Sequence, residues 1–373
     1  MRIGISCYPT HGGSGVLATE LGIELARRGH VVHFLCYNKP FRLDRLYNNV
    51  HFHRVQVNEY PLFKYPPYSL ALTSAMVDVT RHHDLQLMHA HYAIPHSVSA
   101  WMAREMLTDR KLPVVTTLHG TDITLVGQQP AYEEITCFAL RASNGITAVS
   151  EDLARQTREL FCQDLSIETI HNFVDTQVYR PTRNTELRSQ FAPPGVPLLV
   201  HASNFRPVKR VLDAIRIFDH VQQETDCRLI MMGIGPDRQA AEDLVHSLGH
   251  DERVHFLDNQ ESILDLLSVA DLLLLPSETE SFGLVALEAM SCGVPVLASD
   301  VGGLRELVES GRTGFLCPRG NPEAFAMRAL QLLQDRGLYD QVAGEARQSA
   351  VTRFDTSVIV PRYEAHYQRV LES

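Results

Sequence analysis

The sequence predicts an α/β protein made of two doubly wound domains, each a parallel sheet with helices on both faces. Short β-branched and aliphatic runs alternate with amphipathic stretches of helical period along the chain. Residues 272–275 are four consecutive leucines, as expected of a central strand buried on both faces. The length of 373 residues also exceeds the roughly 150 residues of an ordinary domain.

The first half is expected to contain seven strands, at residues 2–8, 31–36, 51–55, 86–89, 113–118, 145–149 and 167–170. The clearest helix between them lies at 14–28, where Leu17, Leu21 and Leu25 recur at a four-residue spacing before Gly29. Strands that alternate with helices in this way form parallel sheets.

The second half repeats the pattern, with strands expected at residues 198–202, 228–232, 254–257, 272–275 and 294–298. A polar stretch containing proline and glycine, residues 172–195, reads as a linker. We therefore expect domains at 1–174 and 175–355, and a last segment, 356–373, whose helix packs back on the first domain. Two such sheets facing one another leave a cleft at the carboxyl ends of their strands, where open α/β sheets bind ligands.

Composition excludes several classes of protein. The chain has 34 Lys and Arg against 44 Asp and Glu, a net charge of −10, which argues against non-specific nucleic-acid binding. It has no apolar run long enough for a membrane span and begins without a signal-peptide pattern. Its seven scattered cysteines suit reduced thiols. We expect a cytoplasmic protein with no membrane or nucleic-acid partner, and leave open whether it is a homo-oligomer.

A glycine-rich loop, PTHGGSG, follows the first strand at residues 9–15. Gly13 and Gly15 allow a close backbone approach, and the first turn of the next helix, with Ser14, offers N–H groups to a pyrophosphate or carboxylate. The alternative is a plain tight turn with Ser14 as N-cap. The loop matches neither the P-loop nor the clean GxGxxG pattern, which disfavours an ATPase or a simple dehydrogenase.

Two glutamates follow the leucine strand. The loop after it presents Glu280, and a helix starting near Phe282 is expected to carry Glu288 about two turns later. N–H groups at Gly283 and Leu284 can hold a diphosphate or sugar hydroxyls, and carboxylates accept hydrogen bonds from sugar hydroxyls. The alternative is two solvated acids on a surface helix.

Glu280 and Glu288, separated by seven residues within ESFGLVALEAM, resemble the E-x7-E motif of retaining glycosyltransferases with the GT-B fold. Residues 293–296, 302–308 and 314–316 look like the rest of that family's donor domain. Residues 7–16, 40–42, 63–68, 89–96, 116–124 and 203–211 resemble a branch that uses L-malate as acceptor.

The resemblance covers nearly the whole chain. It implies two Rossmann-like domains and transfer of N-acetylglucosamine from UDP-N-acetylglucosamine to the malate hydroxyl, the first step of bacillithiol biosynthesis. Another small or lipid acceptor, or a nucleotide-sugar epimerase, remains the alternative.

The resemblance also implies roles for single residues. Arg206 and Lys209 would neutralise the departing diphosphate, although Asn204 stands where the commoner pattern has its arginine, five residues before the lysine. His119 would position the donor sugar and, with Arg206, Lys209 and Glu280, form the catalytic set. Further donor contacts are expected from Gly13, Gly15, Asn204, Phe282, Gly283, Leu284 and Glu288. Acceptor contacts are expected from Ser14, Lys64, Tyr92 and Thr117; Lys64 could equally be a solvated loop lysine, and Tyr92 a packing residue.

No metal or cofactor is expected. Of the 18 histidines, His82 and His83 are adjacent and poorly placed to share an ion, while His89 and His91 fall at a strand end. Neither pair has a cysteine or carboxylate set with zinc-type spacing, and the sequence has no Asp-x-Asp motif. Apart from His119, most of the histidines are expected at the surface or in loops.

Overall fold

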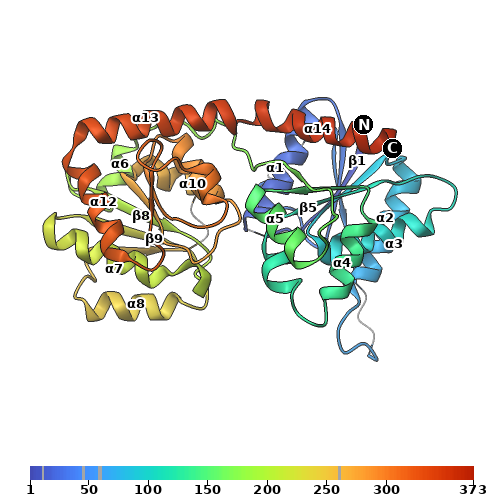
Figure 1. Cartoon of the computed structure of the whole chain (residues 1–373), viewed down its shortest axis with the longest axis horizontal. Coiled ribbons are helices and arrows are strands. Elements are labelled where there is room, and N and C mark those ends of the chain that lie inside the picture. Colours follow the sequence, from blue (N-terminus) through green and yellow to red (C-terminus); the bar gives the residue numbers. More distant parts are fainter. Residues whose placement is uncertain (11, 44–46, 58–60, 259–261) are drawn as a thin grey trace. The chain divides into compact units, whose positions relative to one another are not determined.

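The computed structural model describes residues 1–10, 12–43, 47–57, 61–258 and 262–373, and the chain divides into two compact units (Figure 1). The first domain comprises Met1–Asn172 together with Ile359–Ser373, and the second comprises Phe173–Val358. Within the described residues, no helix combines the length and apolar character that a membrane crossing requires.

The sheet of the first domain has seven parallel strands in the order β3-β2-β1-β4-β5-β6-β7. The strands are β1 (Arg2–Ser6), β2 (Val31–Cys36), β3 (Val50–Arg54), β4 (Leu87–His91), β5 (Val114–Leu118), β6 (Gly145–Ala148) and β7 (Glu168–Thr169). The helices are α1 (Gly13–Arg27), α2 (Tyr68–His83), α3 (Val98–Met106), α4 (Glu133–Ala142) and α5 (Glu151–Leu160), with short turns η1 (Ala93–Ser97) and η2 (Asp122–Val126). The strand order reverses between β1 and β4, the position at which open α/β sheets bind ligands.

The sheet of the second domain has six parallel strands in the order β10-β9-β8-β11-β12-β13. They are β8 (Leu198–Ala202), β9 (Arg228–Met232), β10 (Val254–Leu257), β11 (Leu272–Leu275), β12 (Val296–Ser299) and β13 (Phe315–Cys317). Here the order reverses between β8 and β11. The sequence did not predict β13, a three-residue strand that carries too little periodicity to be recognised.

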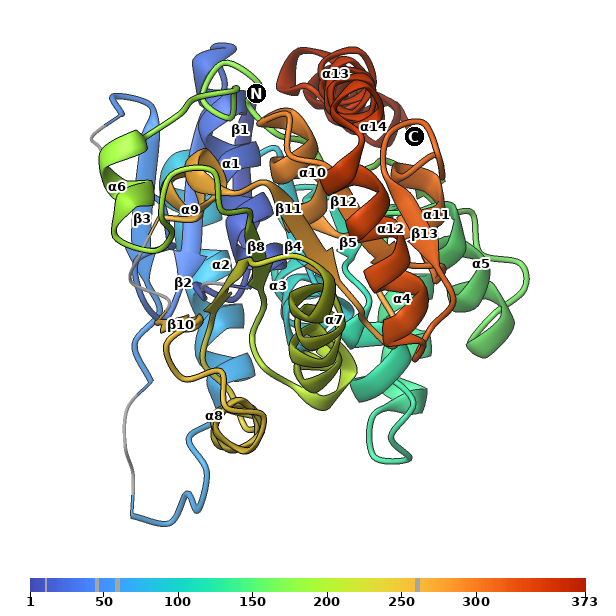
Figure 2. The ribbon, with the colours of Figure 1, turned by 90° about the vertical axis from the view of Figure 1, so that its left-hand side faces the viewer.

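Helices cover both sheets, and the predicted α/β class is confirmed. In the second domain these are α6 (Thr185–Ser189), α7 (Val211–Glu224), α8 (Arg238–Ser247), α9 (Ile263–Val269), α10 (Leu284–Ser291), α11 (Leu304–Leu307), α12 (Pro322–Gln334) and α13 (Arg336–Arg353), with a turn η3 (Pro207–Lys209). The four leucines of β11 are at most 1% exposed, because β11 lies between β8 and β12. Figure 2 shows α7 and α12 among the elements of this domain. Apolar side chains of these two helices join those of the strands in one buried core.

The last helix, α14 (Thr356–Glu372), contributes most of its length to the first domain. The Tyr367 hydroxyl lies 2.8 Å from Nδ1 of His89 on β4, and Arg362 donates to the carbonyl of Thr169, 2.7 Å away. His366 Nδ1 lies 2.7 Å from the Glu168 carboxylate. These contacts attach the end of the chain to the first sheet, where both termini are seen in Figure 1.

Candidate active site

The candidate site of the first domain lies at the carboxyl ends of β1, β4 and β5, which are neighbours in the sheet. The glycine loop follows β1, Tyr92 follows β4 and His119 follows β5. Because parallel strands bring their carboxyl ends to one edge, the sheet gathers these three segments at the point where the strand order reverses.

Tyr92 and His119 form a stacked pair. Their ring centroids are 5.5 Å apart at 18°, and Tyr8 meets Tyr92 edge-on at 5.3 Å. His119 Nε2 also lies 2.9 Å from Nδ1 of His91. Tyr92 has φ 90°, a strained conformation for a non-glycine residue, and its N–H donates to the Thr117 carbonyl at 3.0 Å. The two rings are therefore held in fixed positions. Tyr92 packs against both Tyr8 and His119, which is the packing role that the sequence left as the alternative to an acceptor contact.

Burial lowers the pKa of His119 to about 3. The imidazole is thus neutral at physiological pH. Its Nε2 is engaged by His91, so Nδ1 is the ring nitrogen that can form a hydrogen bond to a ligand, without positive charge. This state suits hydrogen bonding to a sugar hydroxyl, the role that the sequence predicts, and does not suit neutralisation of a phosphate.

Asp122 holds the loops after β4 and β5 together. Its carboxylate is completely buried and accepts the N–H groups of Ala93 at 3.1 Å, His119 at 3.1 Å and Gly120 at 2.9 Å. Burial raises its pKa to about 6, against the effect of these hydrogen bonds. Sequence reasoning missed this role. An acidic residue four positions after the end of a strand, within HGTD, was the available signal.

Replacing Asp122 with asparagine should destabilise the protein by about 1–3 kcal/mol, because an amide nitrogen would oppose one of the three buried donors. Chemical denaturation at pH 7.5 measures this loss, and an exposed control, Asp109→Asn, should leave the unfolding free energy within about 0.5 kcal/mol. If the two variants unfold alike, Asp122 does not support these loops.

The glycine loop closes tightly on α1. The helix begins at Gly13 with Gly12 as N-cap, so Ser14 lies in the first turn and the alternative of a Ser14 N-cap is wrong. A Cβ on Gly15 would stand 2.5 Å from the Thr10 carbonyl oxygen, so this position requires glycine. Val16 is the first residue whose N–H bonds to the Gly12 carbonyl, at 3.1 Å, which leaves the preceding N–H groups without helical acceptors. His11 of this loop lies outside the described residues.

Thr117, predicted to contact the acceptor, is engaged within the protein. Its side chain is completely buried, and its hydroxyl lies 2.6 Å from His89 Nε2 and 2.6 Å from the Thr147 hydroxyl. The hydroxyl therefore belongs to an internal polar chain, and its acceptor contact stays a prediction.

Lys64 is exposed, with Nζ 5.5 Å above the ring of Tyr65. The adjacent Phe63 lines a hollow of about 400 Å³ beside α2. Neither contact fixes a role for the ammonium group, so its acceptor contact stays a prediction.

In the second domain, an ion pair joins the loops after β8 and β11. Lys209 Nζ lies 2.5 Å from Oε2 of Glu280, and the two side chains are 22% and 14% exposed. The N–H of Glu278 donates to the Val208 carbonyl at 2.7 Å, a second link between the same loops. The sequence predicted both charged residues at the site, and the structure brings them into contact.

Arg206 and Asn204 are exposed on the loop after β8. Among the described residues, the Arg206 guanidinium forms no hydrogen bond or ion pair. A bound anion could therefore use its donors without displacing another carboxylate, whereas at Lys209 it would compete with Glu280.

His201, on β8, fixes the conformation of the loop that follows this strand through hydrogen bonds of both ring nitrogens. Its Nδ1 lies 2.9 Å from the Leu274 carbonyl oxygen and its Nε2 2.8 Å from the Ser203 hydroxyl. The Ser203 oxygen in turn accepts the N–H of Phe205 at 3.3 Å. Burial lowers the pKa of His201 to about 4, so the ring is neutral, with Nδ1 donating and Nε2 accepting. Sequence reasoning missed this residue.

Two glycines after β9 were also missed. A Cβ on Gly233 would stand 1.8 Å from the Ser203 carbonyl oxygen, and one on Gly235 would stand 2.2 Å from that of Asn204. The loop after β9 thus packs backbone to backbone against the loop that carries Asn204 and Arg206. A Gly-x-Gly sequence directly after a strand was the available signal.

The turn into α10 places backbone donors at the same edge. Gly283 adopts φ 95° as the N-cap, and the first helical bond runs from Leu287 N–H to the Gly283 carbonyl at 3.1 Å. The N–H groups of Leu284 and the two residues after it therefore have no helical acceptor. Glu288, in the second turn, is only 5% exposed, so the alternative of two solvated surface acids is wrong.

The structure limits the donor contact predicted for Phe282 to its backbone. Its side chain is 1% exposed and packs edge-on against Phe354, with ring centroids 5.8 Å apart. An aromatic residue at the start of this helix serves the core, so only its backbone remains for a ligand.

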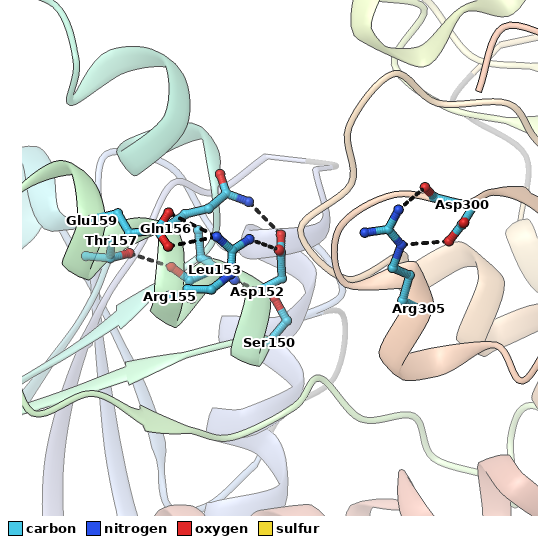
Figure 3. Close-up of polar contacts among 9 residues, drawn as sticks. All are labelled: Ser150, Asp152, Leu153, Arg155, Gln156, Thr157, Glu159, Asp300 and Arg305. Carbon is cyan, nitrogen blue, oxygen red and sulfur yellow. Dashed lines mark hydrogen bonds and ion pairs between the residues drawn. The ribbon is translucent and has the colours of Figure 1, made fainter. Parts of the chain in front are cut away.

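Other arginines near strand ends are engaged locally (Figure 3). Arg305 Nε lies 2.6 Å from the carboxylate of Asp300, which follows β12. On α5, which Ser150 caps, Arg155 lies 2.6 Å from Asp152 and 2.9 Å from Glu159. Each of these cations is thus compensated within its own segment, unlike that of Arg206.

Comparison with known proteins gives matches along both halves of the chain. Residues 11–178 match the family model described as Glycosyltransferase Family 4, and residues 182–349 match that of Glycosyl transferases group 1. The N-acetyl-alpha-D-glucosaminyl L-malate synthase of Bacillus anthracis is 44% identical over 372 residues, 100% of this chain and 97% of that protein. A D-inositol 3-phosphate glycosyltransferase of Nocardia farcinica is 32% identical over 67% of this chain and 59% of its own length.

Among solved structures, the sucrose-phosphate synthase of Thermosynechococcus elongatus superposes with a TM-score of 0.84 at 20% identity, covering 100% of this chain and 99% of that one. This likeness shows the GT-B fold, as the sequence predicted. Because the identity to the Bacillus protein extends over the whole chain, and glycosyltransferase models match both of its halves, the chain belongs to the GT-B glycosyltransferases.

Proposed function

We propose that the protein transfers N-acetylglucosamine from UDP-N-acetylglucosamine to the hydroxyl of L-malate, with retention of the α configuration, as the first step of bacillithiol biosynthesis. The observation that carries this proposal is the 44% identity over the full length to a relative named as an N-acetyl-alpha-D-glucosaminyl L-malate synthase. The proposed donor domain is the second, and the proposed acceptor domain the first.

The donor diphosphate is proposed to bind at the carboxyl ends of β8 and β11. A uridine diphosphate leaving group gains negative charge as the glycosidic bond breaks, so positive charge and N–H groups fixed beside it lower the barrier. Lys209, Arg206 and the first turn of α10 supply these groups. Glu288 and Glu280 are proposed to accept hydrogen bonds from donor hydroxyls, with Glu280 also holding Lys209 in position.

We infer a front-face mechanism, in which the malate hydroxyl attacks from the side that the leaving group vacates. Double displacement would require an accessible carboxylate nucleophile at the anomeric carbon. Glu280 is occupied by its ion pair with Lys209, and Glu288 is 5% exposed in α10. A departing phosphate oxygen is then the base that takes the acceptor proton. Mass spectrometry of enzyme quenched during turnover should reveal no glycosyl adduct; a stable adduct on a carboxylate would refute this mechanism.

The acceptor is proposed to bind in the first domain, near the N-terminus of α1. L-Malate carries two carboxylates, which bind at backbone N–H groups and cations. Ser14 in the first turn of α1, Tyr92 and the exposed Lys64 are the proposed contacts. His119 is proposed to hold the donor sugar.

Replacing Lys64 with alanine should raise the KM for malate about tenfold or more, the loss expected for one charge-assisted hydrogen bond. The KM for UDP-N-acetylglucosamine should change less than twofold. Initial rates at varied concentrations of each substrate measure both constants, and Lys39→Ala provides a lysine control in the same domain. Equal increases in the two constants would remove Lys64 from the acceptor site.

An inositol phosphate acceptor is the second candidate, favoured by the 32% identity to the Nocardia protein. A nucleotide-sugar epimerase is the third and needs no acceptor. UDP release from UDP-N-acetylglucosamine, measured with malate, with inositol 3-phosphate and with neither, separates all three. The proposal predicts release that depends on malate.

A further inference from the structure

Four histidines gather at the edge of the first sheet, away from the candidate active site. His33 lies on β2, His51 and His53 on the edge strand β3, and His83 is the last residue of α2. The strand register pairs His33 with His51, and Leu35 with His53. Because paired residues of parallel strands, and alternate residues of one strand, share a face, the three strand histidines project from the same side of the sheet.

Their rings are in contact. His33 Nδ1 lies 2.9 Å from His53 Nε2, and the ring of His83 lies with its centroid 4.6 Å from that of His33 and 5.2 Å from that of His53. One ring nitrogen from each of these three residues lies within 4.8 Å of the others. His33 is buried, His53 half-buried and His83 exposed, so the group opens to solvent on one side.

We propose that His33, His53 and His83 bind one divalent late transition-metal ion, represented by Zn²⁺, with water or His51 in the fourth position. Imidazole nitrogens are preferred ligands of such ions. Tetrahedral zinc with Zn–N bonds of 2.0–2.1 Å places its ligand atoms about 3.4 Å apart. The longer separations, up to 4.8 Å, must close by about 1.4 Å, a movement that the exposed His83 side chain at the end of its helix can supply. The 2.9 Å between His33 and His53 must open by about 0.5 Å.

The site would stabilise the fold and take no part in sugar transfer. It joins the edge strand β3 to β2 and to the end of α2, elements that are far apart in the sequence. The three ligands come from β2, β3 and the end of α2, and none belongs to the loops after β1, β4 and β5. Metal bound to the folded state alone raises the unfolding temperature by mass action.

The direct test is calorimetric titration of Zn²⁺ into tag-free, full-length protein in a non-chelating buffer. We expect one ion per chain, a raised unfolding temperature, and at least tenfold weaker binding in His53→Gln and His83→Gln. His83→Gln alters only an exposed side chain at a helix end, so its fold should persist. The matched control is His82→Gln, the preceding residue of α2, whose Nδ1 lies 2.8 Å from the Asp78 carbonyl; it should bind like the wild type.

The absorption spectrum of bound Co²⁺, used in place of Zn²⁺, shows which kinds of atom coordinate the ion. Tetrahedral nitrogen coordination without thiolate bands supports the proposal. Thiolate bands would instead locate the ion at cysteines such as Cys137 and Cys162, whose sulfurs are 2.7 Å apart, and would overturn it. Equal Zn²⁺ affinity in His83→Gln and His82→Gln, or no saturable binding, would overturn it as well.

Discussion

Replacing Lys209 with alanine should lower kcat about 10²–10³-fold, the usual effect of removing one group that stabilises developing charge. The substitution removes positive charge at the proposed diphosphate and leaves the Glu280 carboxylate, 14% exposed, without its 2.5 Å partner. The second consequence adds repulsion between Glu280 and the leaving group. Initial rates with UDP-N-acetylglucosamine and malate, together with the Kd of UDP, measure both effects, and UDP binding should weaken in parallel.

Arg305→Ala is the matched control. It also removes a cation near a strand end of the second domain, but one already paired with Asp300 at 2.6 Å. Its kcat should stay within twofold of the wild type. If Lys209→Ala and Arg305→Ala have the same modest effect, the diphosphate does not bind between β8 and β11.

Lowering the pH should destabilise the first domain steeply, because the folded domain buries several neutral histidines. Burial lowers the pKa of His96 and His119 to about 3, and those of His89 and His91 well below the ordinary value. Above about pH 6.5 these rings are neutral in both the folded and unfolded states. As the pH falls below that value, the unfolded chain takes up protons that the folded domain cannot. These histidines therefore contribute their full stabilisation above pH 6.5. The stabilisation is lost as the pH falls toward their pKa values in the folded state.

Between pH 7.5 and 5.5, each of the four histidines should lower the unfolding free energy by about 1 kcal/mol. Asp122 acts in the opposite direction, since its folded pKa is raised to about 6 and its contribution declines as the pH rises through that value. One such group does not offset four. Urea denaturation across this pH range measures the slope.

His96→Gln should remove the roughly 1 kcal/mol that His96 adds to the loss of unfolding free energy between pH 7.5 and 5.5, whatever its effect on stability at pH 7.5. The exposed His246, whose side chain is 83% exposed, supplies the control variant His246→Gln. A slope unchanged by His96→Gln would show that His96 is not held neutral in the folded protein.

The fold could be predicted almost entirely from the sequence, because its signals are local. The alternation of strand and helix patterns predicted the α/β class, and the run Leu272–Leu275 matches a strand exactly as long as expected. The end of β4 was placed two residues early, since the alternation of His89 and His91 with small residues does not resemble a buried strand. The short strand β13 is recognised by its pairing with β12, which is not evident from the sequence.

Residues of the candidate site that belong to a sequence motif could be predicted. Residues that support the site by holding other loops in place could not. Glu280 and Lys209 were found from their motifs, and the structure adds the ion pair that joins them. Asp122, His201 and Gly235 act by holding loops, a role that depends on backbone groups brought together only by the fold. The sequence also did not indicate that the side chains of Thr117 and Phe282, both assigned to substrates, are buried in the fold.

The histidines show the same limit. His83 was set aside because its sequence neighbour cannot share an ion with it. Its contacts are instead His33 and His53, which lie 50 and 30 positions earlier in the sequence and are brought to it by the β2–β3 register and the end of α2.

The central claim is α-selective transfer of N-acetylglucosamine to malate. The most direct measurement is the NMR analysis of the product formed by purified protein from UDP-N-acetylglucosamine and L-malate. The account predicts an α-linked N-acetylglucosaminyl malate, formed in equal amount to UDP and absent without malate. A β-linked product, or UDP release that does not depend on malate, would contradict it.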